Sequence, residues 1–243
     1  MTLAQRVVLV TGSTSGIGEA TALRFASSGA SVVFNSARSV EAGLELASRT
    51  ANSLYVRADI SSDEECRMLI DQVIATYGRL DVLVNNAGTT RVIAHRDLGA
   101  ATLDVWREIF EVNVFGTWNL SVKAMEHLRA SNGAIVNVSS LAGLRPTGSS
   151  IPYAASKAAL NHMTSLLAKV VGPEVRVNAV APGLVDTPWT EDWDVVRGFV
   201  ESVAPLRRSG QPTDVAEVIV AIASSSYVTG QVIAIDGGLG LTT

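Results

Sequence analysis

The stretch Val7-Val8-Leu9-Val10-Thr11-Gly12-Ser13-Thr14-Ser15-Gly16-Ile17-Gly18 decides the fold of this chain. Its four leading apolar residues are typical of a buried strand, and the apolar residues from Ala20 to Ala26 predict a helix directly after the glycines. Glycines let the backbone turn sharply and approach a diphosphate, while the amides and the positive end of the helix dipole bind its charge. The order strand, glycine turn, helix therefore predicts a nucleotide site.

The same loop argues against two other glycine-rich motifs. A P-loop of nucleoside triphosphatases needs a Lys-Ser or Lys-Thr pair after its second glycine, and Ile17-Gly18 stands there instead. The Gly-x-Ser-x-Gly elbow of hydrolases needs a central serine, whereas the central residue between Gly12 and Gly16 is Thr14. We therefore expect neither a triphosphatase nor a hydrolase.

Apolar runs recur along the chain and alternate with longer helical stretches. They lie at residues 7–10, 32–34, 54–56, 82–84, 135–138, 175–180 and 232–235. Parallel strands that helices cover on both faces have such continuous Val, Ile and Leu runs. The rhythm predicts an α/β protein with a doubly wound, seven-stranded parallel sheet and helices on both faces, a Rossmann fold. Because no linker divides residues 1–243, we expect a single nucleotide-binding domain.

The composition narrows the class of protein. The chain has 243 residues, of which 47% are hydrophobic, and a formal net charge of -4. The acidic balance argues against a nucleic-acid surface, and no apolar run reaches the length of a membrane span. Residues 1–6 lack the core of a signal peptide, so we expect a cytoplasmic protein. The lone Cys66 excludes an intramolecular disulfide, and the scattered His95, His127 and His162 predict no metal site.

A phenol and an ammonium lie four residues apart in Tyr153-Ala154-Ala155-Ser156-Lys157 and share one face of a helix. A tyrosine titrates near ~10, so a cation must favour its phenolate before it can transfer protons at neutral pH. Ser140 follows the apolar run 134–138, upstream of Tyr153, and its hydroxyl is suited to hold a carbonyl oxygen. An exposed helical pair is the alternative interpretation of Tyr153 and Lys157 taken alone.

The end of the second predicted strand bears on the choice of cofactor. Asn35-Ser36-Ala37-Arg38 contains no carboxylate that would bind a ribose 2′-hydroxyl and repel a 2′-phosphate. A small polar residue followed by an arginine accommodates that phosphate. We therefore expect NADP(H), with NAD(H) as the alternative. Arg38 has the alternative role of capping or solvating its loop.

With these motifs, the chain resembles the classical short-chain dehydrogenase/reductase family over essentially its whole length, and it is similar to its 3-oxoacyl-[acyl-carrier-protein] reductase-like members. The family's glycine motif is Thr11 to Gly18, and its sheet-stabilising motif is Asn85-Asn86-Ala87-Gly88. Pro182-Gly183 and Thr187 complete the set. The catalytic residues of the family match Asn113, Ser140, Tyr153 and Lys157.

The resemblance implies hydride transfer between a nicotinamide and a ketone or secondary alcohol, with Tyr153 as general acid and base. Ser140 would hold the substrate oxygen, Lys157 would lower the tyrosine pKa and bind the nicotinamide ribose, and Asn113 would hold a water that relays protons. The residues expected to bind the cofactor are Gly12, Thr14, Ser15, Gly16, Ile17, Gly18, Ser36, Arg38, Asp59, Ile60, Asn86, Ala87, Gly88, Tyr153, Lys157, Pro182, Gly183, Val185 and Thr187.

The substrate is expected to contact Ser140, Leu141, Tyr153, Trp189 and Trp193. By resemblance, residues at about 188–205 form a mobile lid, and the two indoles share one face of it if the segment is helical. They predict either an apolar pocket wall or packing of the lid onto the body. Because members of the family reduce thioesters, ketosteroids, sugars and quinones, the fold does not choose among small-molecule substrates.

The sequence leaves open an alternative substrate and an alternative function, and the resemblance implies an oligomer. A 3-oxoacyl thioester linked to acyl carrier protein or coenzyme A is the alternative substrate, although residues 126–134 contain one arginine where carrier-docking relatives cluster basic residues. A non-catalytic NADP-binding regulatory or structural subunit is the alternative of another class, and the intact Tyr153 and Lys157 argue against it. The resemblance also implies a homotetramer, with a dimer as alternative, built from helices around 106–128 and 154–171 and from strand 232–235.

Overall fold

A parallel sheet forms the centre of the computed structural model, which describes residues 4–242. Its seven strands lie in the order β3-β2-β1-β4-β5-β6-β7, and each pairs in parallel with its neighbours. The strands are β1 Val7–Val10, β2 Ser31–Ser36, β3 Ser53–Arg57, β4 Val82–Asn85, β5 Ala134–Val138, β6 Arg176–Pro182 and β7 Val232–Ile235. The predicted Rossmann topology is confirmed, and of the predicted strand residues only Val175 lies outside a strand.

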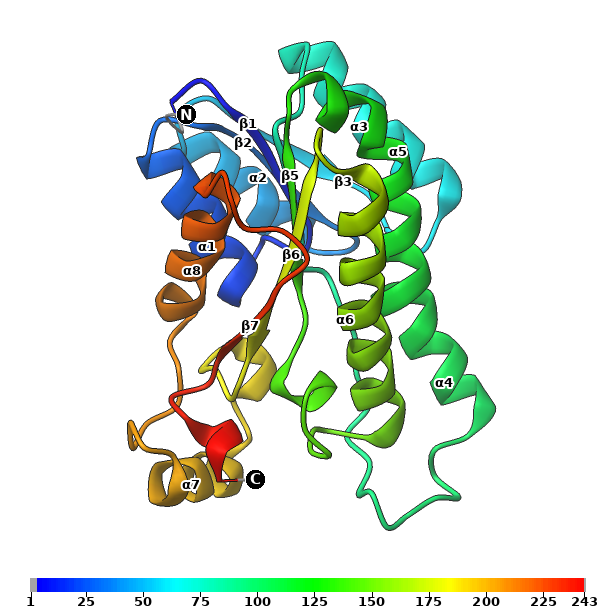
Figure 1. Cartoon of the computed structure of the whole chain (residues 1–243), viewed down its shortest axis with the longest axis vertical. Coiled ribbons are helices and arrows are strands. Elements are labelled where there is room, and N and C mark those ends of the chain that lie inside the picture. The colour runs from blue at the N-terminus through cyan, green and yellow to red at the C-terminus, as the bar shows by residue number, and fades with distance from the viewer. Residues whose placement is uncertain (1–3, 243) are drawn as a thin grey trace.

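Helices cover both faces of the sheet (Figure 1). One face carries α1 Gly16–Ser27, α2 Val40–Arg49 and α8 Pro212–Ser224, and the other carries α3 Asp63–Tyr77, α5 Thr117–Ala130 and α6 Ile151–Val171. The stretch predicted as helical around 106–128 comprises α4 Leu103–Phe110, a π-helical turn Glu111–Gly116 and the start of α5. α7 Asp194–Val203 lies apart from both layers, beyond the sheet (Figure 1).

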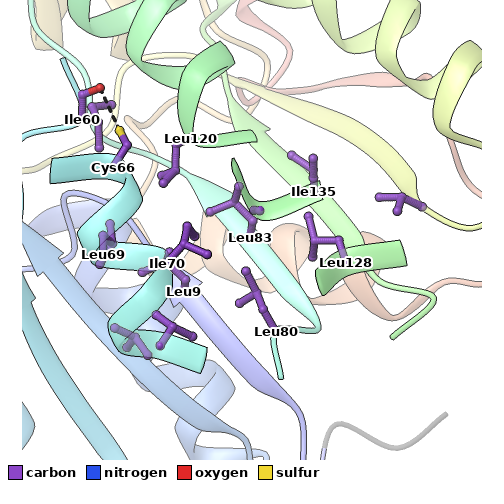
Figure 2. Packing of buried hydrophobic residues seen from close by; sticks show 14 of the residues in the cluster. Leu9, Ile60, Cys66, Leu69, Ile70, Leu80, Leu83, Leu120, Leu128 and Ile135 are labelled. Carbon is purple, nitrogen blue, oxygen red and sulfur yellow. Dashed lines mark hydrogen bonds between the residues drawn. The ribbon is translucent and has the colours of Figure 1, made fainter. Parts of the chain in front are cut away.

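Successive strand residues point to opposite faces of the sheet and fill two separate cores. Leu9, Leu83 and Ile135 pack under α3 and α5, as Figure 2 shows. Cys66 lies in this core, and its thiol donates a hydrogen bond to the carbonyl of Ile60 at 3.2 Å (Figure 2). Burial raises the pKa of Cys66 to about 11, so this cysteine is a core residue rather than a reactive thiol.

The strand order determines where a ligand can bind. β1 lies between β2 and β4, and the chain leaves β1 toward one face and β4 toward the other. A crevice opens at such a switch point, beyond the carboxyl ends of the strands. Within residues 4–242, no helix is long and apolar enough to cross a membrane.

Candidate active site

The loop after β1 is clamped to the loop after β4. The hydroxyl of Thr11 accepts hydrogen bonds from the amides of Asn86 and Ala87, both at 3.0 Å. The side-chain amide of Asn86 donates to the carbonyls of Thr11 and Gly12, both at 2.9 Å. Gly12 has a φ of +60°, and a Cβ there would lie 2.9 Å from the Cα of Ala87. Glycine is therefore required where the two loops meet.

A cavity of about 780 Å³ runs along the carboxyl ends of the strands. This volume falls within the range of small-molecule sites. The cavity is lined by every predicted substrate residue and by every predicted cofactor residue except Gly18, which packs beneath the loop against Gly12. Of the predicted catalytic residues, only Asn113 lies outside the lining.

Tyr153 and Lys157 occupy successive turns of α6, beside the end of β5. The Nζ of Lys157 lies 5.7 Å from the centroid of the Tyr153 ring and donates a hydrogen bond to the carbonyl of Val138 at 2.8 Å. Ser140 begins the turn after β5, and its hydroxyl accepts from the amide of Ala142 at 3.2 Å. The structure thus brings the three predicted groups together from two elements.

Burial sets the electrostatics of this group. It lowers the pKa of Lys157 to about 8, and the side chain is 4% exposed. Burial also raises the pKa of Tyr153, and a hydrogen bond with Ser140 opposes that rise. A buried cation is costly until an anionic group lies beside it, so the pocket favours negative charge near Lys157. The lowering of the tyrosine pKa by Lys157 stays a prediction.

Asn113 lies in the π-helical turn and is 1% exposed. Its side-chain amide donates to the carbonyl of Thr89 and to the hydroxyl of Ser156, both at 3.0 Å, and its Oδ1 accepts from the amide of Thr89 at 2.8 Å. These bonds tie the loop after β4 to α6. The proposed proton-relay role of Asn113 stays a prediction.

The other end of the cavity lies beyond β2 and β3. Arg38 is exposed at its rim, whereas Ser36 is buried with its hydroxyl 2.8 Å from that of Tyr55. Burial raises the pKa of Asp59, but hydrogen bonds from Ser61 and the charges of Arg38 and Arg57 outweigh it, so the pKa lies below its usual value. The side chain of Ser15 makes no capping bond at the start of α1, which leaves amides of the first turn to an anion. These features fit a dinucleotide.

At the substrate end, the indole of Trp189 meets the ring of Tyr153 edge-on, with centroids 6.4 Å apart. The segment is not one continuous helix, because Trp189 lies in a 3₁₀ turn, Pro188–Thr190, and Trp193 is the N-cap residue of α7. Both indoles nevertheless line the cavity, as an apolar wall requires. Phe199 of α7 also lines the cavity, and the sequence analysis did not predict this. The amphipathic pattern of α7 is the signal that identifies it.

Asp186 fixes the segment that carries these indoles. Its carboxylate accepts from Nε of Arg197 at 2.9 Å and from the side chains of Ser209 and Gln211, both at 2.8 Å. Arg197 belongs to α7, and Gln211 precedes α8. Asp186 also precedes Thr187, a predicted cofactor residue. The sequence carried no signal for this junction, which joins residues up to 25 positions apart.

Comparisons with known proteins agree with this arrangement. The family model described as "Enoyl-(Acyl carrier protein) reductase" matches residues 12–240. The chain is 56% identical to "Granaticin polyketide synthase putative ketoacyl reductase 2" of Streptomyces violaceoruber, over 96% of this chain and 95% of that protein. It is 41% identical to "3-oxoacyl-[acyl-carrier-protein] reductase FabG" of Thermotoga maritima, over 98% and 99% of the two chains.

A solved structure supports the same conclusion. The "putative short-chain dehydrogenase/reductase from Burkholderia xenovorans" superposes with a TM-score of 0.92 at 39% identity, covering 98% of each chain. Relatives named as reductases and dehydrogenases act on carbonyl or alcohol groups, and the family uses a nicotinamide cofactor. The chain is an oxidoreductase that belongs to the short-chain dehydrogenase/reductase family.

Proposed function

We propose that the chain reduces a ketone to a secondary alcohol with NADPH, and that Tyr153 is the proton donor. The observation that carries this proposal is the meeting of Tyr153, Lys157 and Ser140 in the cavity. When bound, a nicotinamide would supply the hydride that the carbonyl carbon receives. Tyr153 donates its proton to the carbonyl oxygen, while Ser140 hydrogen-bonds that oxygen as negative charge develops on it. Lys157 stabilises the phenolate that remains.

The direct test is NADPH oxidation by the purified protein in the presence of small neutral ketones, followed by recovery of the alcohol. We expect turnover that depends on both the ketone and the cofactor. Failure of the protein to bind either NADPH or NADH in a calorimetric titration would contradict the proposal. The relatives and the intact catalytic set give no support to the alternative of a non-catalytic subunit.

We further propose that Arg38 selects NADPH by binding its 2′-phosphate, because this exposed cation lines the cavity beyond β2. Replacing it by a carboxylate removes a charge-assisted hydrogen bond worth ~1.5–3 kcal/mol. Arg38→Glu is therefore expected to weaken NADPH binding about 10- to 100-fold in calorimetric titrations and to leave NADH binding nearly unchanged. Arg24→Glu, on the exposed face of α1, is the matched control. Equal losses for both cofactors would refute the assignment.

A thioester substrate is the second candidate, because similar proteins carry the names ketoacyl reductase and 3-oxoacyl-[acyl-carrier-protein] reductase. An anionic carrier needs a cation near the cavity, and two arginines there already have partners in the protein. Arg91 pairs with Glu108 at 3.0 Å, and Arg145 donates a hydrogen bond to the carbonyl of Gly240 at 3.0 Å. Comparing acetoacetyl thioesters of coenzyme A and of an acyl carrier protein with a free ketone decides between the candidates. A carrier preference of tenfold or more would favour the thioester.

We propose a homotetramer in the cytoplasm, with α5 in an interface. Phe115, Trp118 and Val122 form an exposed apolar stripe on this helix and the turn before it, with exposed fractions of 55%, 47% and 49%. Contiguous exposed apolar surface of this kind marks interfaces. Sedimentation is expected to give four times the chain mass of 25.5 kDa. Trp118→Glu is expected to yield smaller species. An unchanged tetramer in that variant would show that α5 does not lie in the interface.

A further inference from the structure

An indole meets the ring of the proposed proton donor at the substrate end of the cavity. The rings of Trp189 and Tyr153 are 6.4 Å apart with an interplanar angle of 65°. Trp189 lines the cavity, and 47% of its surface is exposed. A substrate whose carbonyl oxygen is held by Tyr153 and Ser140 therefore places the carbon skeleton next to that carbonyl against the indole.

Hydrogen bonds hold the turn that carries Trp189. The hydroxyl of Thr190 donates to the carbonyl of Val185 at 2.7 Å and accepts from the amide of Thr187 at 3.2 Å. A guanidinium nitrogen of Arg197 donates to the carbonyl of Thr190 at 3.2 Å. An indole on a fixed turn presents a face of defined orientation, which selects for planar groups more strongly than a flexible aliphatic side chain does.

Apolar side chains of the lid line the same end of the cavity. Trp193, Val196 and Phe199 line it, and Val200 of α7 packs with Leu141 in a small core beneath. Among the described lining residues the only cations are Arg38 and Lys157, which belong to the proposed cofactor contacts. The acidic lining residues beside the loop after β4 are Glu108 and Glu111. A neutral group fits this end.

We propose that the substrate is a neutral ketone with an aromatic ring attached to a carbon next to the carbonyl, and that Trp189 and Trp193 recognise that ring. The inference rests on the proposed function and names its substrate class. Edge and offset contacts between aromatic rings add a preference of roughly 2- to 12-fold per pair beyond the area that they bury. Two indoles thus give a combined preference of roughly 4- to 140-fold over a saturated ring with the same carbon skeleton.

The test compares 2-tetralone with trans-2-decalone, which share a bicyclic skeleton and differ in whether one ring is aromatic. We expect kcat/KM with NADPH to be about tenfold or more higher for 2-tetralone. Trp189→Phe keeps an aromatic face and is expected to retain most of the preference. Trp189→Leu keeps apolar volume without a ring, and the ratio is expected to fall to within about threefold. A wild-type ratio near one, or equal ratios in the two variants, would overturn the inference.

A binding measurement separates this inference from the proposed reaction. Calorimetric titration of the NADPH-saturated protein with 2-tetralol and with trans-2-decalol forms complexes that cannot react. We expect the same preference for the aromatic ring, and a fall of that preference to within about threefold in Trp189→Leu. A preference in binding without ketone turnover would support the aromatic site and contradict the proposed reaction. Turnover of both ketones without preference in either measurement would support the reaction and contradict the aromatic site.

Discussion

Replacing Tyr153 by phenylalanine is expected to lower kcat for ketone reduction by about 10²–10⁴-fold, the contribution of a positioned proton donor. The substitution removes only the phenolic oxygen. The ring that packs against Trp189 and lies beside Lys157 stays in place. NADPH affinity is therefore expected to change little, and the loss should appear in kcat. Steady-state kinetics together with calorimetric titration of the cofactor measure the two effects separately.

Tyr77→Phe is the matched control, because it removes a phenolic oxygen outside the cavity, where that oxygen lies 3.4 Å from the carbonyl of Asn52. We expect wild-type kinetics in this variant. If Tyr153→Phe kept its turnover, another group would have to supply the proton, and the proposed mechanism would be wrong. A parallel loss of NADPH binding would instead assign Tyr153 mainly to cofactor binding.

The substitution Gly18→Ala is expected to have the second large effect. A Cβ at Gly18 would lie 2.4 Å from the carbonyl oxygen of Gly12 and 2.5 Å from the side-chain nitrogen of Asn86. These two atoms form the hydrogen bond that clamps the loops after β1 and β4. Because one of them is backbone, relief requires the loop to move. We expect a loss of ~3 kcal/mol in the free energy of unfolding and NADPH binding at least about tenfold weaker.

Gly198→Ala provides the control, because it places the same methyl group in a helix where a Cβ would meet nothing within 4 Å. A glycine in an exposed helix interior costs ~1 kcal/mol relative to alanine. The control variant is therefore expected to be slightly more stable than the wild type in thermal unfolding. Equal behaviour of the two variants would show that Gly18 is not required for close approach.

Sequence patterns of short range were sufficient to predict the fold. The run Val7-Val8-Leu9-Val10 and its counterparts predict buried parallel strands because helices cover both faces of the sheet. The glycines from Gly12 to Gly18 predict the turn into α1, since their need for close backbone approach is local. The order of strands and glycine turn also locates the crevice at the carboxyl ends. The predicted cofactor residues consequently line one cavity, with Gly18 as the exception.

Other features of the site depend on contacts between distant segments, which no local pattern encodes. The pKa of Lys157 near 8 results from burial, and burial is the sum of everything packed around the side chain. The anchoring of Asp186, by Arg197 within the lid and by Gln211 beyond it, likewise joins segments that are separate in the sequence.

By itself, the sequence determined the Rossmann fold, the strand-end crevice and the identity of the candidate proton donor, because these follow from periodicity and from spacing along one helix or loop. Only the tertiary structure decided that Trp189 meets Tyr153 edge-on and that Phe199 joins the same wall. The physical reason is that side chains from separate elements come within contact only after the sheet, α6 and α7 have packed, so their mutual orientation is a property of the packed molecule.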